Sequence, residues 1–145
     1  MFTSDTKRHF IISGIIYSIT TIFLYFFAKI YTHYSYGESS AYMNNMYLIM
    51  LFGGFINLLI QLALINFKHY FKAAHNLYNS GLACIISGML IKGIINISGR
   101  YTEVHIIYFE AGIFFLVLSF AAMIVTILQL HYHMRSFTHK KTHPH

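Results

Sequence analysis

Four long apolar runs constrain this chain more than any other feature of its sequence. A membrane core of about 30 Å needs roughly 20 apolar residues in helical conformation. The runs meet that requirement and span residues 10–30, 46–67, 77–97 and 104–130. Because they are too long and too uniformly apolar for barrel strands, and because the connections between them are short, they predict an all-α polytopic membrane protein. We expect a four-transmembrane-helix antiparallel bundle.

The composition excludes the soluble alternatives. Only 10% of the residues are charged and 57% are hydrophobic, whereas about a quarter of a soluble domain is charged. The same apolar content argues against disorder. A single Cys leaves no disulfide framework and no multi-thiolate metal or iron–sulfur site.

The distribution of Lys and Arg predicts the orientation. The cationic residues flanking one end of the spans are Lys7, Arg8, Lys68, Lys72, Arg135, Lys140 and Lys141, against Lys29 and Arg100 at the other. Cytoplasmic segments carry the excess of positive charge. We therefore expect a multi-pass protein of the cell membrane with both termini cytoplasmic and the first span retained. We expect residues 1–133 to form one transmembrane domain and residues 134–145 a basic, His-rich cytoplasmic tail that is mobile.

The net charge of +6 does not point to nucleic acid. The cationic residues lie beside the ends of the spans, where they set the orientation and attract anionic lipid headgroups. We therefore expect the lipid bilayer as the partner, together with a homo-oligomer or a larger membrane complex, and no nucleic acid.

Lys92 and Glu110 are the charged residues inside the last two apolar runs. Each lies about five residues from the predicted outer end of its helix, or about 7–8 Å below the interface. Two neighbouring antiparallel helices would place them at one depth, where an unpaired charge is costly. They are interpreted as an intramembrane ion pair that clips the hairpin, or as an ion-binding site centred on Glu110.

Three amide side chains also lie within the spans. Asn57 and Gln61 are one helical turn apart, and Asn96 lies near the end of the third run. Amides in a membrane form hydrogen bonds between helices or line a polar pathway. Both interpretations are open.

The ten histidines lie near the ends of the spans or in the tail. A bis-His haem needs two of them on different helices at one depth. His33 with His105, and His69 or His75 with His131, are the candidate pairs. His131 and His133 are the nearest to a metal site, but ligands on a loose tail bind metals poorly, so we expect no metal and no cofactor.

No arrangement of residues in the sequence predicts catalysis. There is no nucleophile motif, zinc-protease motif or phosphate-binding loop, and no base beside a candidate nucleophile. We expect no enzyme but a membrane subunit or scaffold. The alternatives are a homo-oligomeric small transporter or channel using Glu110 and Lys92, and a membrane redox protein binding haem or quinone.

The chain contains the short motifs Glu38-Ser-Ser-Ala-Tyr-Met43, Gly53-Gly54, Tyr78-Asn-Ser-Gly81 and Lys92-Gly93-Ile-Ile-Asn-Ile-Ser-Gly99. With these motifs it resembles a family of small four-helix bacterial integral membrane proteins of uncharacterised activity. The resemblance covers the last three spans. It implies the four-helix fold and no activity.

Overall fold

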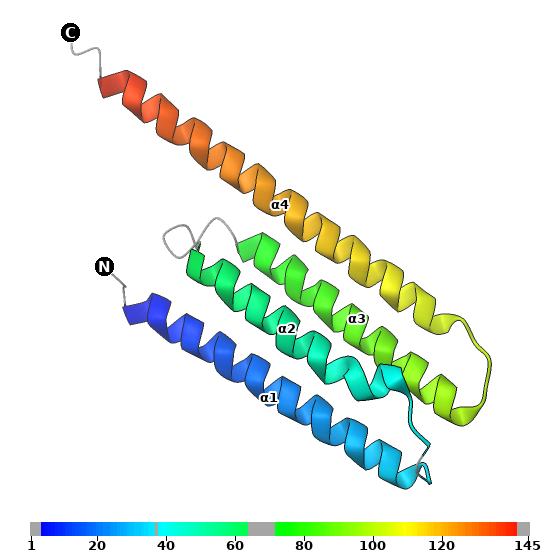
Figure 1. Ribbon diagram of the computed structural model, residues 1–145. Helices are drawn as coiled ribbons and strands as arrows, with labels where there is room; N and C mark the ends of the chain where they lie inside the picture. Colours follow the sequence, from blue (N-terminus) through cyan, green and yellow to red (C-terminus); the bar gives the residue numbers. More distant parts are fainter. Residues whose placement is uncertain (1–3, 37, 64–71, 142–145) are drawn as a thin grey trace.

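The computed structural model describes residues 4–36, 38–63 and 72–141, which form four α-helices (Figure 1). They are α1 (Ser4–Tyr34), α2 (Ala41–Ala63), α3 (Lys72–Ser98) and α4 (Val104–Lys141). Each contains a segment long and apolar enough to cross a membrane. These segments are Phe10–Tyr34, Ala41–Leu62, Lys72–Ser98 and Val104–Gln129. Among the described residues, the prediction of four helices long and apolar enough to span a membrane is confirmed in number and approximate position.

Local chemistry fixes several helix ends. The carbonyl of Ser40 accepts the first hydrogen bond of α2, from the backbone N–H of Asn44 at 2.9 Å. After α3, Gly99 takes a φ of 64°, the left-handed conformation that ends many helices and that glycine adopts without strain. The backbone N–H of Val104 at the start of α4 lies 3.4 Å from the hydroxyl oxygen of Thr102. These contacts account for two short connections at the same end of the molecule.

The helices pack in the order of the chain: α1 on α2, α2 on α3, and α3 on α4. Along the first two of these interfaces, residues with higher numbers in one helix contact residues with lower numbers in the next. Tyr17 lies against Gly54 and Gly14 against Leu58, and further along Gly93 lies against Met43 and Gly53 against Leu82. Among the described residues, no other pair of helices forms an extended interface. Figure 1 accordingly shows an open array, with α1 and α4 as its two outer helices.

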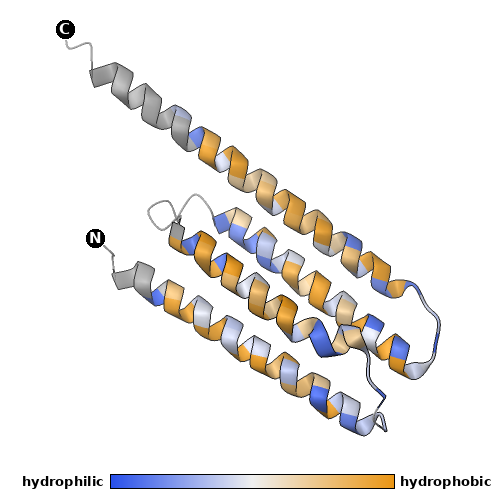
Figure 2. Cartoon of the chain, in the orientation of Figure 1, coloured by the Kyte–Doolittle hydropathy of each residue, from blue (hydrophilic) through white to orange (hydrophobic). Residues whose placement is uncertain are grey.

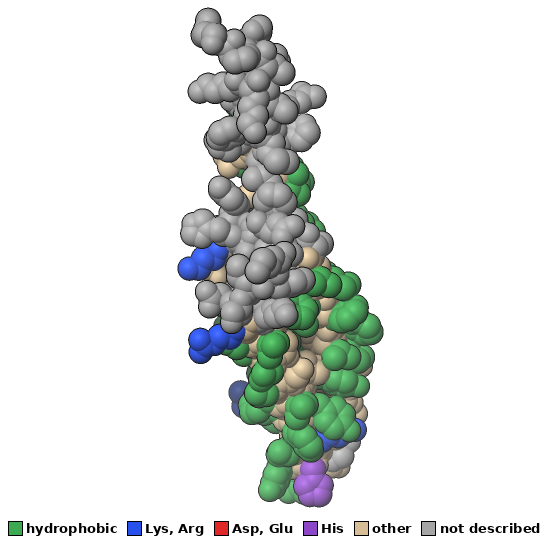
Figure 3. All heavy atoms as spheres, turned by 90° about the vertical axis from the view of Figure 1, so that its left-hand side faces the viewer, with side chains coloured by type: hydrophobic (Ala, Val, Ile, Leu, Met, Phe, Trp, Pro, Cys, Tyr) green, Lys and Arg blue, Asp and Glu red, His purple; other side chains and the backbone are tan. Residues whose placement is uncertain are grey.

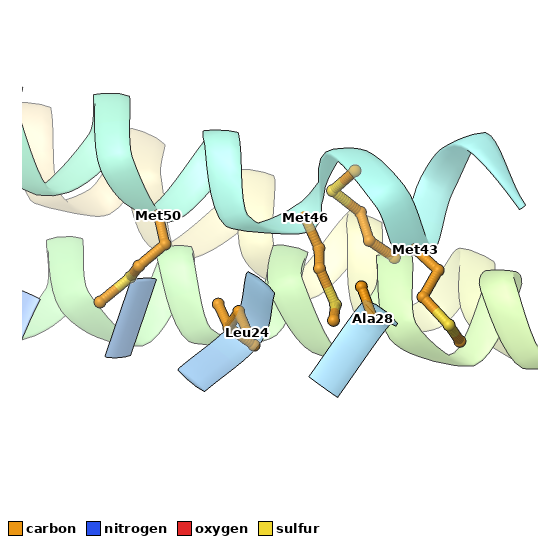
Figure 4. Packing of buried hydrophobic residues seen from close by; sticks show 6 residues of the cluster. Leu24, Ala28, Met43, Met46 and Met50 are labelled. Carbon is orange, nitrogen blue, oxygen red and sulfur yellow. The ribbon is translucent and has the colours of Figure 1, made fainter. Parts of the chain in front are cut away.

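The buried core lies between the first three helices. It consists of Leu24 and Ala28 of α1, three methionines of α2 and Met89 of α3 (Figure 4). The methionines of α2 are Met43, Met46 and Met50, and the first two are completely buried. Methionine side chains are unbranched and flexible, so they fill the irregular space between helices that approach unevenly.

Large apolar side chains cover the outside of the array. Figure 2 shows mostly hydrophobic residues along α4 up to its grey end, and hydrophobic side chains dominate the described lower part of the face in Figure 3. On α1 and α4 the exposed side chains include Ile19, Phe23, Ile107 and Leu128. An apolar exterior of this kind is what lipid tails or other transmembrane helices cover.

Helix α4 continues well past the predicted end of its span at Leu130. It runs to Lys141 without interruption, through the predicted domain boundary at residues 133 and 134 (Figure 1). The tail, residues 134–145, was predicted to be mobile; its backbone is helical as far as Lys141. Residues 142–145 lie outside the described part of the chain. So do residues 64–67, the predicted end of the second span.

Candidate functional site

The most polar arrangement within the membrane-spanning segments centres on Asn57 of α2. Its side chain is 3% exposed. Gln61, one turn further along α2, donates from Nε2 to Oδ1 of Asn57 over 3.0 Å. Asn57 in turn donates from Nδ2 to Oδ1 of Asn79 on α3 over 3.2 Å. Asn57 and Gln61 are therefore hydrogen-bonded to each other, and Asn57 links α2 to α3.

His75 completes this arrangement from α3. Its Nδ1 lies 2.9 Å from Oδ1 of Asn57, and its Nε2 lies 3.2 Å from Nδ2 of Asn79. An amide oxygen only accepts and an amide nitrogen only donates. With the amides placed this way, the geometry fits a neutral imidazole that carries its hydrogen on Nδ1 and accepts at Nε2.

Tyr17 brings the first helix into the same network. Its hydroxyl donates to Oδ1 of Asn79 over 2.6 Å. Between them lies Gly54 of α2, where an added Cβ would be only 2.9 Å from Cγ of Tyr17. The ring crosses α2 where that helix has no side chain. We call Tyr17, Asn57, Gln61, His75 and Asn79 the amide cluster.

The amide cluster holds three helices together. Its hydrogen bonds join α1 to α3, and α2 to α3, within one region. Buried polar groups need such partners in a membrane, and each bond between helices contributes roughly 0.6–2 kcal/mol. Amide groups and a neutral imidazole recognise ligands by hydrogen bonding and hold no net charge. The cluster is therefore suited to clamping helices or to binding a neutral polar group.

The sequence analysis identified only part of the cluster. Asn57 and Gln61 were singled out by their spacing of four residues, and His75 with Asn79 has the same spacing. That second pair was missed because the third span was predicted to begin at Leu77, which left His75 at the interface. The structure begins α3 at Lys72.

The structure does not bring Lys92 and Glu110 together. Within the described residues, neither side chain takes part in an ion pair. The ammonium of Lys92 lies 6.0 Å from the centroid of the Tyr42 ring on α2. The carboxylate of Glu110 is exposed on the surface of α4. The expected ion pair is therefore not formed within one chain.

Two features of the packing keep these charges apart: the rotation of α4 and the offset between α3 and α4 along their axes. Gly112 faces α3, against Ile85 and the carbonyl oxygen of Gly81. At 100° per residue, Glu110 points about 200° away from that contact, to the outside of the array. Gly88 also packs against Tyr108, so Lys92 lies level with the start of α4. Along the helix axis it is about 9 Å closer than Glu110 to the end of the array where α4 begins. Counting residues from the helix ends did not reveal this offset.

Asn96 does not join the amide cluster. Its Nδ2 donates over 3.3 Å to the hydroxyl of Ser40, beside the start of α2. The contact ties the end of α3 to the connection between α1 and α2. Asn96 is thus a local link near one end of the molecule.

The histidine pairs considered for haem are not assembled within the described residues. His33 is exposed near the end of α1. His105 is 9% exposed against α3, and its buried Nδ1 has no hydrogen-bond partner. These two lie on outer helices that do not pack together. The side chains of His69, His131 and His133 lie outside the described part of the chain.

Among the described residues, no group of three or more His, Cys, Asp or Glu side chains is placed to hold a metal ion. No family of proteins, curated protein or solved structure matches this chain. The resemblance to small bacterial four-helix membrane proteins therefore stays a prediction. Its structural content, four apolar helices, agrees with the structure.

Proposed function

We propose that this protein is a non-enzymatic subunit of a membrane complex, held in the cell membrane as an antiparallel four-helix bundle with both termini cytoplasmic. The observation that carries the proposal is the position of Glu110. Its carboxylate lies on the outward side of α4 among Ile107, Ile113 and Phe114, which are 66%, 58% and 60% exposed.

A carboxylate in that position needs a partner. Acidic residues within membrane-spanning helices are costly when they face lipid, and they almost always face a helix interface or a water-filled cavity. The neighbours of Glu110 on this surface are apolar, and no described residue of the same chain pairs with it. A further transmembrane helix seated on α4 would supply the missing polar contact.

The distribution of basic residues supports the orientation. The start of α1, the end of α2, the start of α3 and the end of α4 lie toward one end of the array (Figure 1), so the segments that precede or follow these helix ends belong to that side. Those segments contain the larger share of Lys and Arg outside the spans. By the rule that cytoplasmic segments are the more positive, this end is cytoplasmic.

The test is the size of the native complex. We expect the wild-type protein in native membranes, extracted gently, to migrate as a complex much larger than the single chain. Glu110→Ala should reduce that complex, whereas Glu103→Ala should not, because Glu103 is exposed in the connection before α4. A wild-type protein that migrates as a single chain in all mild detergents contradicts the proposal.

A homo-oligomeric small transporter or channel is the second candidate, because a lone intramembrane acid is also typical of proton and cation pathways. Here Glu110 would bind the ion, with Lys92 beside the outer mouth. Flux into proteoliposomes separates the two candidates. Transport that is abolished by Glu110→Gln, in a protein that stays folded, favours the transporter and overturns the subunit proposal.

A further inference from the structure

The two outer helices of the array carry opposite charges on their outward apolar surfaces. On α1 the charge is Lys29, which is exposed and lies on a different side from the buried Leu24 and Ala28. On α4 it is Glu110. Both residues fall inside the segments that are apolar enough to span a membrane. One chain leaves both charges without an oppositely charged partner among its described residues.

The register of the helices places the backbones of these two residues at different depths. Tyr25 packs on Tyr47 with ring centroids 5.3 Å apart, so Lys29, one turn further, lies level with Met43. Met43 contacts Gly93 on α3, and Gly88 contacts Tyr108 on α4. By these contacts the backbone of Lys29 lies level with the start of α4. It is therefore about 10 Å closer than the backbone of Glu110 to the membrane surface at that end.

The direction of the two side chains removes most of this difference in depth between the charged groups. Side chains on a helix lean toward its N-terminus. The N-terminus of α1 lies at one end of the array and the start of α4 lies toward the other (Figure 1). The ammonium of Lys29 lies 5.8 Å from the centroid of the Tyr25 ring, so it does lean deeper into the span. Glu110, on α4, leans outward by the same rule, and the two charges converge on one depth.

We propose that copies of this chain associate side by side in the membrane, with the outward face of α4 in one copy seated on the outward face of α1 in the next. Lys29 of one copy then pairs with Glu110 of its neighbour. The apolar contact is made by Ile22 and Phe26 of α1 with Ile107 and Phe114 of α4, all more than half exposed in the single chain. The inference rests on the proposed function, because it names the first partner in the complex.

The charges favour this head-to-tail contact over a symmetric one. Two copies joined through α4 alone would bring two Glu110 carboxylates together, and joining through α1 would bring two lysines together. Like charges at one depth repel, whereas the head-to-tail contact pairs opposite charges. Such contacts close into a ring when the rotation between copies permits, and a ring leaves no outer helix uncovered.

The experiment reverses each charge in the full-length protein. Lys29→Glu and Glu110→Lys are each reconstituted in lipid bilayers, and the number of copies per assembly is counted by single-molecule photobleaching. We expect wild-type oligomers and a loss of association on the order of tenfold for each single variant. The double variant should recover, because it restores an opposite pair. Arg100→Glu and Glu103→Lys, both in the exposed α3–α4 connection, are matched controls that should leave the count unchanged.

A mixture of the two single variants tests the head-to-tail contact more specifically. Each reversed outer helix in one variant meets a complementary outer helix in the other, so the mixture should assemble with the two variants alternating. A symmetric contact through one helix does not predict alternation around a ring. Recovery of mixed oligomers of four or more copies, with both variants in equal numbers, supports the head-to-tail contact, because a symmetric contact through one helix gives only mixed dimers.

Three outcomes would overturn the inference: wild-type protein that is monomeric in bilayers, single variants that stay oligomeric, or a folded double variant that does not recover. Helix content by circular dichroism shows whether each variant is folded. If a reversal does not fold, Lys29→Met and Glu110→Gln replace it, and each should weaken association. A monomeric wild type that still migrates in a larger native complex rejects self-association and leaves the proposed function standing. Oligomers that conduct ions support self-association and reject the proposed function.

Discussion

The hydroxyl of Tyr17 on α1 reaches across α2 and donates a 2.6 Å hydrogen bond to Oδ1 of Asn79 on α3. The ring lies over Gly54, the residue of α2 that it crosses. Helices that are not neighbours in the packing order are thus joined directly, through a gap where the middle helix has no side chain. The position of one glycine decides whether the amide cluster reaches α1.

Gly54→Ala should break this link. The new Cβ would lie 2.9 Å from Cγ of Tyr17, a rigid ring that has to move away and lose Asn79. We expect a loss of roughly 1–3 kcal/mol in the free energy of unfolding, measured by SDS titration in bicelles. Gly14→Ala is the control, because its nearest neighbour, a methyl of Leu58, is 4.0 Å away. Equal stability of the two variants would show that the ring accommodates the methyl group.

Asn57→Ala should be the most damaging amide substitution. It removes the acceptor of Gln61 and His75 and a donor to Asn79 at a site that is 3% exposed. We expect a loss of roughly 1–3 kcal/mol in unfolding free energy. Asn96→Ala removes one 3.3 Å bond from an exposed residue and should cost about 0.5 kcal/mol or less. The reverse order would contradict the assignment of the cluster as the main clamp.

Ser119→Ala tests the contact between α3 and α4. The Ser119 hydroxyl is buried and donates over 2.7 Å to the carbonyl oxygen of Ala74 on α3. Its removal should cost about 0.6–1 kcal/mol. Thr126→Val is the matched control, because the Thr126 hydroxyl bonds to the carbonyl of Ala122 in its own helix. Equilibrium unfolding of the two variants side by side distinguishes a bond between helices from one within a helix.

Lys92→Met and Glu110→Gln should act independently within one chain. Lys92 lies on α3 and Glu110 on the outward side of α4, at different depths, so neither compensates for the other. We expect the effects on unfolding free energy to add to within about 0.5 kcal/mol in the double variant, at dilution where the protein is monomeric. A double variant that is substantially more stable than this sum predicts would show that the two residues do form the ion pair predicted from the sequence.

Cysteine labelling should establish the orientation. In a Cys84→Ala background, Ser39→Cys should react with an impermeant maleimide from outside the cell. Thr138→Cys should react only after the membrane is opened, because the orientation proposed from the positive-inside distribution has a cytoplasmic C-terminus. Reaction of both positions from the same side would contradict the proposed topology.

The spans could be predicted because hydropathy and length are the physical requirements for crossing a bilayer. The end of α4 could not, since hydropathy reports the depth of a segment and not its backbone conformation. Helix α4 continues to Lys141 through a mostly polar segment that contains no Gly and no Pro. The loss of apolar character at residue 131 marks the predicted end of the span, and the helix itself continues to Lys141.

The candidate site was only half predictable. Spacing of four residues identifies Asn57 with Gln61, since it places them on one side of a helix. It gives no rotation for a helix relative to its neighbours. Contacts at Gly112 and Ser119 set the rotation of α4 and turn Glu110 outward. A single charge in an apolar run does not show which side of the helix packs.

The packing order has a consequence for biosynthesis. Each helix after the first packs against the helix made just before it, so every such segment leaving the ribosome meets a partner already in the bilayer. Only short loops have to close, and the entropy cost of closing them is small. Assembly can then proceed in one direction, hairpin by hairpin, with no earlier pairing to undo. The bond from Tyr17 to Asn79 forms only after α3 has been inserted, so it locks the first two helices late in synthesis.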